Sequence, residues 1–305
     1  MMHIDHMRID PVYRERLHAC GLGSVDRVLN RTEGQIAAWS RSTETLRVPC
    51  SDGEPAFYVK RYYYPTWQKR LRGMFRGTFF GTHRARAEYH LLCEMRGLGL
   101  PTVRPVAYGV RRIGHFVAAC FLITEEAPEA RNLTSFASDV TEGRIQLTYA
   151  ERRRILIRLA HQVAGLHAAR FAHGQLFWRN ILVRFDPLGQ PEFFFLDVRP
   201  RHGGRQLARG GRWWLHELCH LAVSAKPFTS RTERMRFLIA YFDARGVKRD
   251  ISRVIHEIER LARHWTRHEQ QRIKMNRLFE EWNRQLRIED AKTAESPRAA
   301  PETGS

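Results

Sequence analysis

Residues 173–197 read HGQLFWRNILVRFDPLGQPEFFFLD, two polar segments separated by short apolar runs. The first segment ends at Asn180, and the second begins at Asp197, directly after three phenylalanines and a leucine. An aspartate that closes so apolar a strand is either a turn residue or a metal ligand, and the asparagine is either a turn cap or a second ligand. Carboxylate and carboxamide oxygens suit Mg²⁺. The stretch therefore offers two candidate metal ligands, the second of them after a short strand.

Two polar residues far upstream extend this pattern. Lys60 ends a run of aromatic and β-branched residues that predicts a strand, and Glu88 lies among good helix formers that predict a helix over 83–96. Alone, Lys60 would be a surface lysine, and Glu88, with Glu94 nearby, a solvated helix face. The order of lysine on a strand, glutamate on the next helix, polar loop and aspartate is the order of a protein kinase-like fold.

The pattern matches the parts that phosphoryl transfer needs. These are a cation on the α- and β-phosphates, a carboxylate that holds this cation, and two oxygen ligands for magnesium, because most of the catalysis is positioning and charge neutralisation. The candidates for these parts, in chain order, are Lys60, Glu88, Asn180 and Asp197.

The loop 173–180 has the spacing of H-R-D-x-x-x-x-N, but Gln175 occupies the place of the catalytic aspartate. A carboxamide cannot accept the proton of the acceptor hydroxyl, although it can orient this hydroxyl by hydrogen bonding. Two hypotheses follow: a kinase in which Gln175 is tolerated beside Asp197, and a pseudokinase that binds ATP or glycolipid without turnover.

The rest of the chain predicts an α+β protein with two lobes. Residues 45–60 predict a β-hairpin, 106–110 and 116–124 predict further strands, and an apolar stripe over 155–166 predicts a long helix. A second stripe, from Met275 to Leu286, predicts packing on the core. The expected organisation is an N-terminal extension (1–34), a small antiparallel-sheet N-lobe with one main helix (35–128), a mostly helical C-lobe (129–288) and a disordered tail (289–305).

The composition limits which partners and which cell compartment the protein can have. Lysine and arginine total 51 against 32 acidic residues, a net charge of +19 that predicts a polyanionic partner. Five scattered cysteines without a C-x-x-C pair indicate neither a disulfide framework nor a zinc ribbon. With no apolar signal region and no long uncharged stretch, we expect a cytoplasmic protein that does not span the membrane.

Basic and aromatic residues alternate over 61–86. Such a mixture suits an anionic membrane or glycolipid surface, or a nucleic-acid groove in which aromatic rings stack on bases. Nucleic acid is the weaker hypothesis, because the sequence contains no helix-turn-helix, zinc-finger or RNP pattern.

Residues 216–220 spell H-E-x-x-H, which on a helix places His216 and His220 on one face to bind zinc, with Glu217 as general base. Glu233 is the obvious third ligand. A zinc metalloprotease is therefore a competing enzyme hypothesis, although a chance match is easy in a chain with 15 histidines. The alternative is a core helix of the second lobe.

The chain resembles the lipopolysaccharide kinases that phosphorylate heptose or Kdo sugars of the inner core. The resemblance spans about residues 35–245 and rests on Phe57–Arg61, Arg86–Tyr89, Leu98–Ala107, His173–Asn180, Leu196–Asp197 and Arg234–Tyr241. The run Leu-Gly-Leu-Pro-Thr at 98–102 separates this family from generic protein kinases.

This resemblance implies ATP and Mg²⁺ as cofactors, with Lys60 on the phosphates and Glu88 paired with it. It implies that Asn180 and Asp197 hold magnesium. Glu125 and Ala127 would belong to a hinge segment, 124–127, whose backbone meets adenine, and residues 41–45 would replace the glycine-rich phosphate loop. The implied acceptor is the lipopolysaccharide core or another anionic glycolipid, at the inner face of the cytoplasmic membrane.

Overall fold

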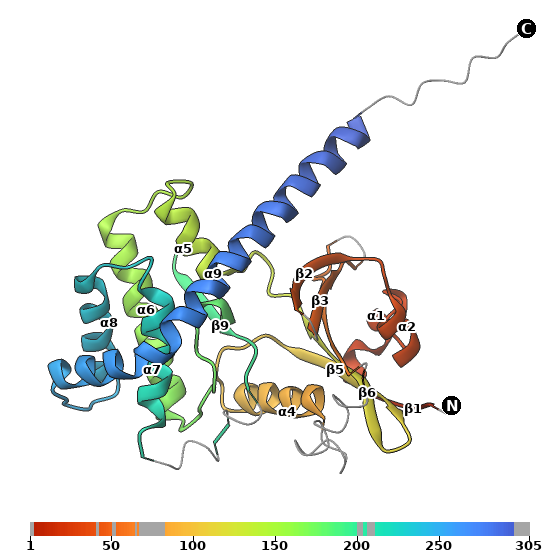
Figure 1. Ribbon diagram of the computed structural model, residues 1–305, viewed down its shortest axis with the longest axis horizontal. Helices are drawn as coiled ribbons and strands as arrows, with labels where there is room; N and C mark the ends of the chain where they lie inside the picture. Colours follow the sequence, from red (N-terminus) through yellow and green to blue (C-terminus); the bar gives the residue numbers. More distant parts are fainter. Residues whose placement is uncertain are drawn as a thin grey trace, which may run out of the picture.

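The structure, a computed structural model, places a sheet-rich lobe beside a helix-rich lobe (Figure 1). It describes residues 3–40, 43–50, 53–64, 66, 83–199, 204–205 and 211–295. The chain passes from one lobe to the other after Glu125, the last residue of the sixth strand. The predicted α+β architecture with two lobes is confirmed.

The N-lobe contains a six-stranded antiparallel sheet in the order β1-β5-β6-β4-β3-β2. Its strands are β1 (His3–Ile9), β2 (Gln35–Ser40), β3 (Thr43–Val48), β4 (Phe57–Tyr63), β5 (Pro105–Ile113) and β6 (Phe116–Glu125). The predicted hairpin is the β3–β4 pair, in which Lys60 lies opposite Thr45. Because successive side chains point to opposite faces, Lys60 and Tyr62 share one face of β4.

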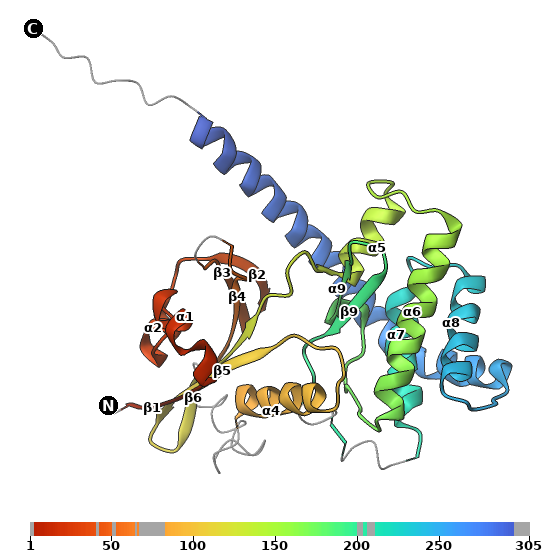
Figure 2. The same ribbon diagram turned by 180° about the vertical axis from the view of Figure 1, so that it is seen from behind.

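Helices cover both faces of this sheet (Figure 2). On one face, Leu46, Val59 and Phe121 form a core with the 3-10 helix η1 (Pro11–Tyr13), α1 (Arg14–Ala19) and α2 (Val25–Asn30). On the other, Tyr62 and Leu122 pack with α4 (Arg84–Gly97), which is the main helix predicted for this lobe. The alternation therefore turns Lys60 toward α4.

Residues 3–30 are part of the N-lobe and not an extension, which corrects the predicted boundary at 34. β1 pairs with β5 along its whole length, from His3 opposite Ile113 to Ile9 opposite Ala107. Leu17 of α1 is fully buried in the core. The strand covers an edge of β5 that would otherwise present unpaired backbone groups. The lobe boundary between 128 and 129 stays a prediction.

The C-lobe is mostly helical around a small sheet in the order β7-β8-β9. Its elements are β7 (Arg131–Asn132), α5 (Leu133–Thr141), α6 (Tyr149–Ala168), η3 (Trp178–Asn180), β8 (Ile181–Phe185), β9 (Pro191–Phe195), α7 (Trp213–Ala225), α8 (Arg231–Ala244) and α9 (Ile251–Glu295). Helix α6 begins with a capping box between Thr148 and Glu151, and it buries the predicted stripe, Leu159 and Val163 included.

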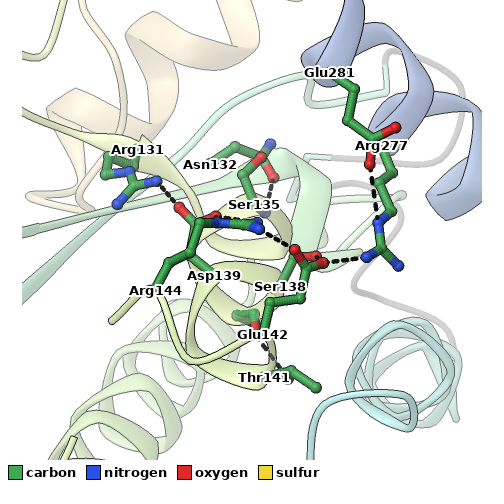
Figure 3. A network of polar contacts seen from close by, with 11 residues as sticks. Arg131, Asn132, Ser135, Ser138, Asp139, Thr141, Glu142, Arg144, Arg277 and Glu281 are labelled. Atoms are coloured by element: carbon green, nitrogen blue, oxygen red, sulfur yellow. Dashed lines mark hydrogen bonds and ion pairs between the residues drawn. The ribbon is translucent and has the colours of Figure 1, made fainter. Parts of the chain in front are cut away.

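Helix α9 is longer than predicted and leaves the C-lobe along its second half (Figure 1). It continues to Glu295, so the tail predicted from 289 begins too early, and residues 296–305 lie outside the described part. Met275 is 63% exposed and Leu278 49% exposed, so their predicted packing on the core is wrong. Arg277 joins α9 to the end of α5 through Glu142, at 2.5 Å (Figure 3).

Across the described residues, no helix has an apolar stretch long enough to cross a membrane.

Candidate active site

Lys60 and Glu88 form the ion pair that the sequence predicted. The Lys60 Nζ lies 2.9 Å from Glu88 Oε1, across the packing of β4 on α4. Tyr62 donates its hydroxyl to the other oxygen of Glu88 at 2.6 Å. Glu88 is 2% exposed, whereas Glu94 is half-buried. Both carboxylate oxygens of Glu88 are engaged, one by Lys60 and the other by Tyr62. Glu88, and not Glu94, is therefore the partner of Lys60.

Asp197 reaches the same lysine from the C-lobe, and its Oδ1 pairs with Lys60 Nζ. Its backbone is left-handed, with φ at +61°, a conformation that costs energy for a residue with a side chain. Two residues earlier, the Phe195 carbonyl accepts a hydrogen bond from Thr102 Oγ1 at 2.6 Å. The run 98–102 therefore holds the end of β9, and through it the position of Asp197.

The loop 173–180 orients its own asparagine. The Asn180 Nδ2 donates to the Gln175 carbonyl at 2.9 Å, and the Asn180 carbonyl accepts from the Leu196 N–H at 3.1 Å. Since the Nδ2 group faces a carbonyl, the Oδ1 of Asn180 is left as the acceptor atom. Asn180 is therefore fixed beside the residue that precedes Asp197, with an oxygen available for a cation.

Gln175 is half-buried in this loop, and its backbone takes part in the loop's hydrogen bonds. Its N–H donates to His173 Nδ1 at 3.3 Å, and its carbonyl accepts from the Phe177 N–H at 2.8 Å. Within the described residues, no hydrogen bond engages its carboxamide. The side chain thus remains able to bind a substrate hydroxyl.

Glu217, on α7, holds the start of the loop 173–180 in place. Its carboxylate accepts the backbone N–H of His173 at 2.7 Å and that of Gly174 at 2.8 Å. Burial alone would raise the pKa of Glu217, but hydrogen bonding and the neighbouring His167 and His173 lower it below its usual range. An ionised, buried carboxylate therefore fixes the start of the loop.

The zinc hypothesis for residues 216–220 is wrong. Glu217 is buried and committed to the loop backbone, and His216 is exposed while His220 is buried. His220 stacks on Phe177, with ring centroids 4.4 Å apart. The proposed third ligand, Glu233, pairs instead with Arg152 at 2.9 Å. Among the described residues, no cluster of three histidine, cysteine or acidic side chains is arranged to hold a metal.

The predicted hinge segment is held by hydrogen bonds of its own. The Glu125 N–H donates to the Arg104 carbonyl at 2.8 Å, and the Glu125 carboxylate accepts from Tyr13 and Arg16, each at 2.8 Å. The Ala127 carbonyl accepts from the Ala130 N–H at 3.1 Å. The hinge segment is therefore held at Glu125 by Tyr13 of η1 and Arg16 of α1.

Most of the basic and aromatic stretch 61–86 lies outside the described residues, since 65 and 67–82 are not described. Arg61 itself is 3% exposed and donates to the backbone carbonyls of Leu29 and Arg31, at 3.0 and 2.8 Å. It therefore holds the N-lobe together instead of contributing to an outer surface. Residues 41 and 42 of the expected phosphate-loop substitute also lie outside the described residues.

Two carboxylates contact the Nζ of the buried Lys60. Burial lowers the pKa of Lys60, Glu88 raises it, and the guanidinium group of Arg84 lowers it again; the net change is downward. The two ion pairs hold the Nζ of Lys60 between Glu88 of the N-lobe and Asp197 of the C-lobe. A buried lysine, its carboxylate partner, and an asparagine and an aspartate from a loop and a strand end are the set of side chains that a phosphotransferase with a protein kinase-like fold uses.

Comparison with known proteins agrees with this class. Residues 27–241 match the model of the lipopolysaccharide kinase (Kdo/WaaP) family. The chain belongs to this family, and it is a kinase.

The relatives are distant. The chain is 27% identical over 182 residues to the lipopolysaccharide core heptose(I) kinase WaaP of Pseudomonas aeruginosa, covering 58% of this chain and 67% of that protein. It is 23% identical over 159 residues to the WaaP of Escherichia coli, covering 52% and 59%. A solved structure of WaaP in complex with acyl carrier protein matches with a TM-score of 0.59 and 22% identity, covering 85% of this chain and 98% of that one. This last likeness shows the fold.

Sequence reasoning missed two site residues, Tyr62 and Glu217. Tyr62 lies two positions after Lys60, so the period of a strand places it on the same face, and this spacing could have identified it. Glu217 was read as the base of a zinc motif. Its true partner, the backbone of residues 173 and 174, lies more than 40 residues away and leaves no trace in the local pattern.

Proposed function

We propose that the chain transfers the γ-phosphoryl group of ATP to a hydroxyl of a heptose or Kdo sugar in the lipopolysaccharide inner core. The observation that carries the proposal is the contact of Lys60 with both Glu88 and Asp197, in a chain that matches the lipopolysaccharide kinase family over 27–241. The relatives are core heptose kinases, which supports the acceptor class.

Each residue has a defined task in this proposal. Lys60, held by Glu88, binds the phosphates of ATP as a point charge. The backbone of Glu125 and Ala127 meets the adenine. The Oδ1 of Asn180 and the carboxylate of Asp197 fit Mg²⁺, which prefers such oxygen ligands. When bound, the metal ion neutralises charge on the phosphates.

Gln175 orients the acceptor hydroxyl and does not remove its proton. The transition state of phosphoryl transfer is loose in most analyses, so little proton transfer is needed at that point, and positioning contributes most of the rate. The amide oxygen of Gln175 accepts the hydroxyl hydrogen bond, and the proton leaves to solvent or to the phosphate. We place the protein in the cytoplasm, on the inner face of the membrane, where its net charge of +19 favours contact with anionic lipid and acceptor.

The test is phosphate transfer from ATP, with Mg²⁺, to purified lipopolysaccharide core. We expect phosphate transfer to fall by at least about 100-fold in Asp197→Ala and in Glu88→Gln. The first variant removes a proposed ligand of the metal ion, and the second removes the charge that holds Lys60 on the phosphates. Glu94→Gln is the matched control, since it changes the same side chain on the same helix away from Lys60. Wild-type turnover in Asp197→Ala would refute the mechanism.

A second candidate, an ATP- or glycolipid-binding pseudokinase, is favoured by Gln175 alone. Gln175→Asp separates the two. If wild type transfers phosphate, the carboxamide is sufficient; if only Gln175→Asp transfers phosphate, the natural protein binds without turnover.

A further inference from the structure

Two cysteines of the N-lobe meet sulfur to sulfur. The thiol of Cys20 donates to the Sγ of Cys50 at 3.0 Å, although 30 positions separate the two residues along the chain. Both side chains are half-buried, and both pack against the core that the sheet forms with α1 and α2. Cys20 precedes residue 27, where the match to the family model begins. The pair is therefore a feature of this chain that the family match does not cover.

The fold holds the backbone of both cysteines in place. Cys20 directly follows α1, its N–H donates to the Arg16 carbonyl at 2.9 Å, and its carbonyl accepts from Arg31 Nη1 at 2.8 Å. Cys50 comes two residues after Val48, the last residue of β3, which is fully buried in the core that α1 shares. Because both backbones are held, the two thiols face each other before any bond between them forms.

The two sulfurs are close enough to bond after a small movement. A disulfide bond is about 2.05 Å long, so an approach of about 1 Å turns the contact into a bond. Burial and the hydrogen bond with Cys50 raise the pKa of Cys20 to about 12, against the opposing effect of the Arg16 charge. Since the thiolate and not the thiol is the nucleophile, Cys20 is the resting thiol, and an oxidant reacts with Cys50 first.

We propose that Cys20 and Cys50 are a modification site that forms a reversible disulfide, with a small disulfide such as oxidised glutathione as the oxidant. The Cys50 sulfur loses its proton and attacks one sulfur of glutathione disulfide, and one glutathione leaves and takes up the proton. Cys20 then loses its proton and attacks the Cys50 sulfur, so the second glutathione leaves as its thiol. The two cysteines together lose two electrons, and the small disulfide is reduced to two thiols.

The new bond joins the end of α1 to the residues that follow β3. Helix α1 carries Arg16, which contacts Glu125 of the hinge segment at 2.8 Å and the Pro55 carbonyl, just before β4, at 2.6 Å. A disulfide that closes the loop from Cys20 to Cys50 removes conformational freedom mainly from the unfolded chain. We therefore expect the oxidised protein to have a Tm roughly 5–10 °C above that of the reduced protein.

The experiment incubates the full chain in glutathione buffers of increasing oxidised fraction, blocks free thiols with iodoacetamide, and maps the unreduced peptides by mass spectrometry. We expect a peptide pair linked through Cys20 and Cys50 that dithiothreitol separates, together with the higher Tm. Cys93→Ser is the matched control, because Cys93 is also half-buried but lies on α4. This variant should keep the linked peptides and the Tm shift, whereas Cys50→Ser and Cys50→Ala should lose both.

The peptide map of the wild-type protein decides the proposal, so it does not depend on whether a variant folds. Iodoacetamide on both Cys20 and Cys50 at the most oxidising ratio would overturn it. Glutathione retained on one cysteine without a linked peptide, or a link to another cysteine in place of this pair, would do the same. None of these measurements involves phosphate transfer, so the inference is independent of the proposed function.

Discussion

Replacing Glu217 by glutamine tests whether a buried carboxylate sets the geometry of the loop 173–180. In the native protein the two carboxylate oxygens accept two backbone N–H groups, from His173 and Gly174, at 2.7 and 2.8 Å. Glutamine has nearly the same shape but offers one oxygen and one NH₂ group. One backbone N–H would then face a donor, in a site where Glu217 is 3% exposed.

The magnitude follows from these two contacts. A hydrogen bond to a charged group contributes about 1.5–3 kcal/mol, and a buried donor left unsatisfied costs about 1–3 kcal/mol. Since Glu217→Gln loses one such bond and weakens the other, we expect the free energy of unfolding to fall by about 2–4 kcal/mol. The loop would also shift, and a displacement on the order of 1 Å can lower kcat about 100-fold.

Urea unfolding and phosphate transfer to lipopolysaccharide core measure the two effects. The control is His216→Gln, one residue earlier on α7 and exposed, which should change neither quantity. An unchanged unfolding midpoint in Glu217→Gln, with normal kcat, would show that the loop does not depend on this carboxylate. Equal losses in both variants would show that the effect does not come from the contact of this carboxylate with the loop backbone.

Two further substitutions probe groups that face the same loop. Burial lowers the pKa of His220 to about 4. As the pH falls below about 6.5, this histidine takes up a proton in the unfolded protein but not in the folded one, so the free energy of unfolding decreases until about pH 4. His220→Phe should reduce this loss of stability by on the order of 2–3 kcal/mol. Urea unfolding midpoints at pH 7.5 and 4.5 measure the loss in wild type and variant, and an equal loss in the two proteins would contradict the prediction. The buried Glu269 of α9 pairs with the guanidinium group of Arg179. Glu269→Ala leaves Arg179 buried without its carboxylate and should cost about 3–5 kcal/mol, part of which Arg179→Met should restore in the double variant. Strictly additive costs in that cycle would argue against the pair.

Much of the fold follows from local periodicity. The β3–β4 hairpin and α6 were predicted from the spacing of their apolar residues, α4 from its good helix formers, and the two short strands around the loop from their apolar runs. The order of Lys60, Glu88 and Asp197 predicted that they would meet, and the structure brings all three together. Their roles in binding ATP and magnesium stay predictions.

The failures have a common cause, since periodicity reports an apolar face and not its partner. β1 is mostly exposed, so it carries little apolar signal, and its pairing with β5 could not be read from residues 3–9. The stripe at Met275 and Leu278 correctly indicated a helix, but nothing in the spacing shows whether a core covers it. Burial depends on residues elsewhere in the chain.

Glu217 shows the same limit at the level of function. A glutamate between two histidines at positions i and i+4 is the local pattern of a zinc enzyme, and equally of a helix that buries one carboxylate. The difference lies in what meets the carboxylate: here two backbone N–H groups of a distant loop, with His216 exposed to solvent. Two N–H donors leave the carboxylate ionised and immobile, which suits an anchor and not a general base. Glu217 of this motif therefore has a structural role, because it fixes the start of the loop that carries Gln175 and Asn180.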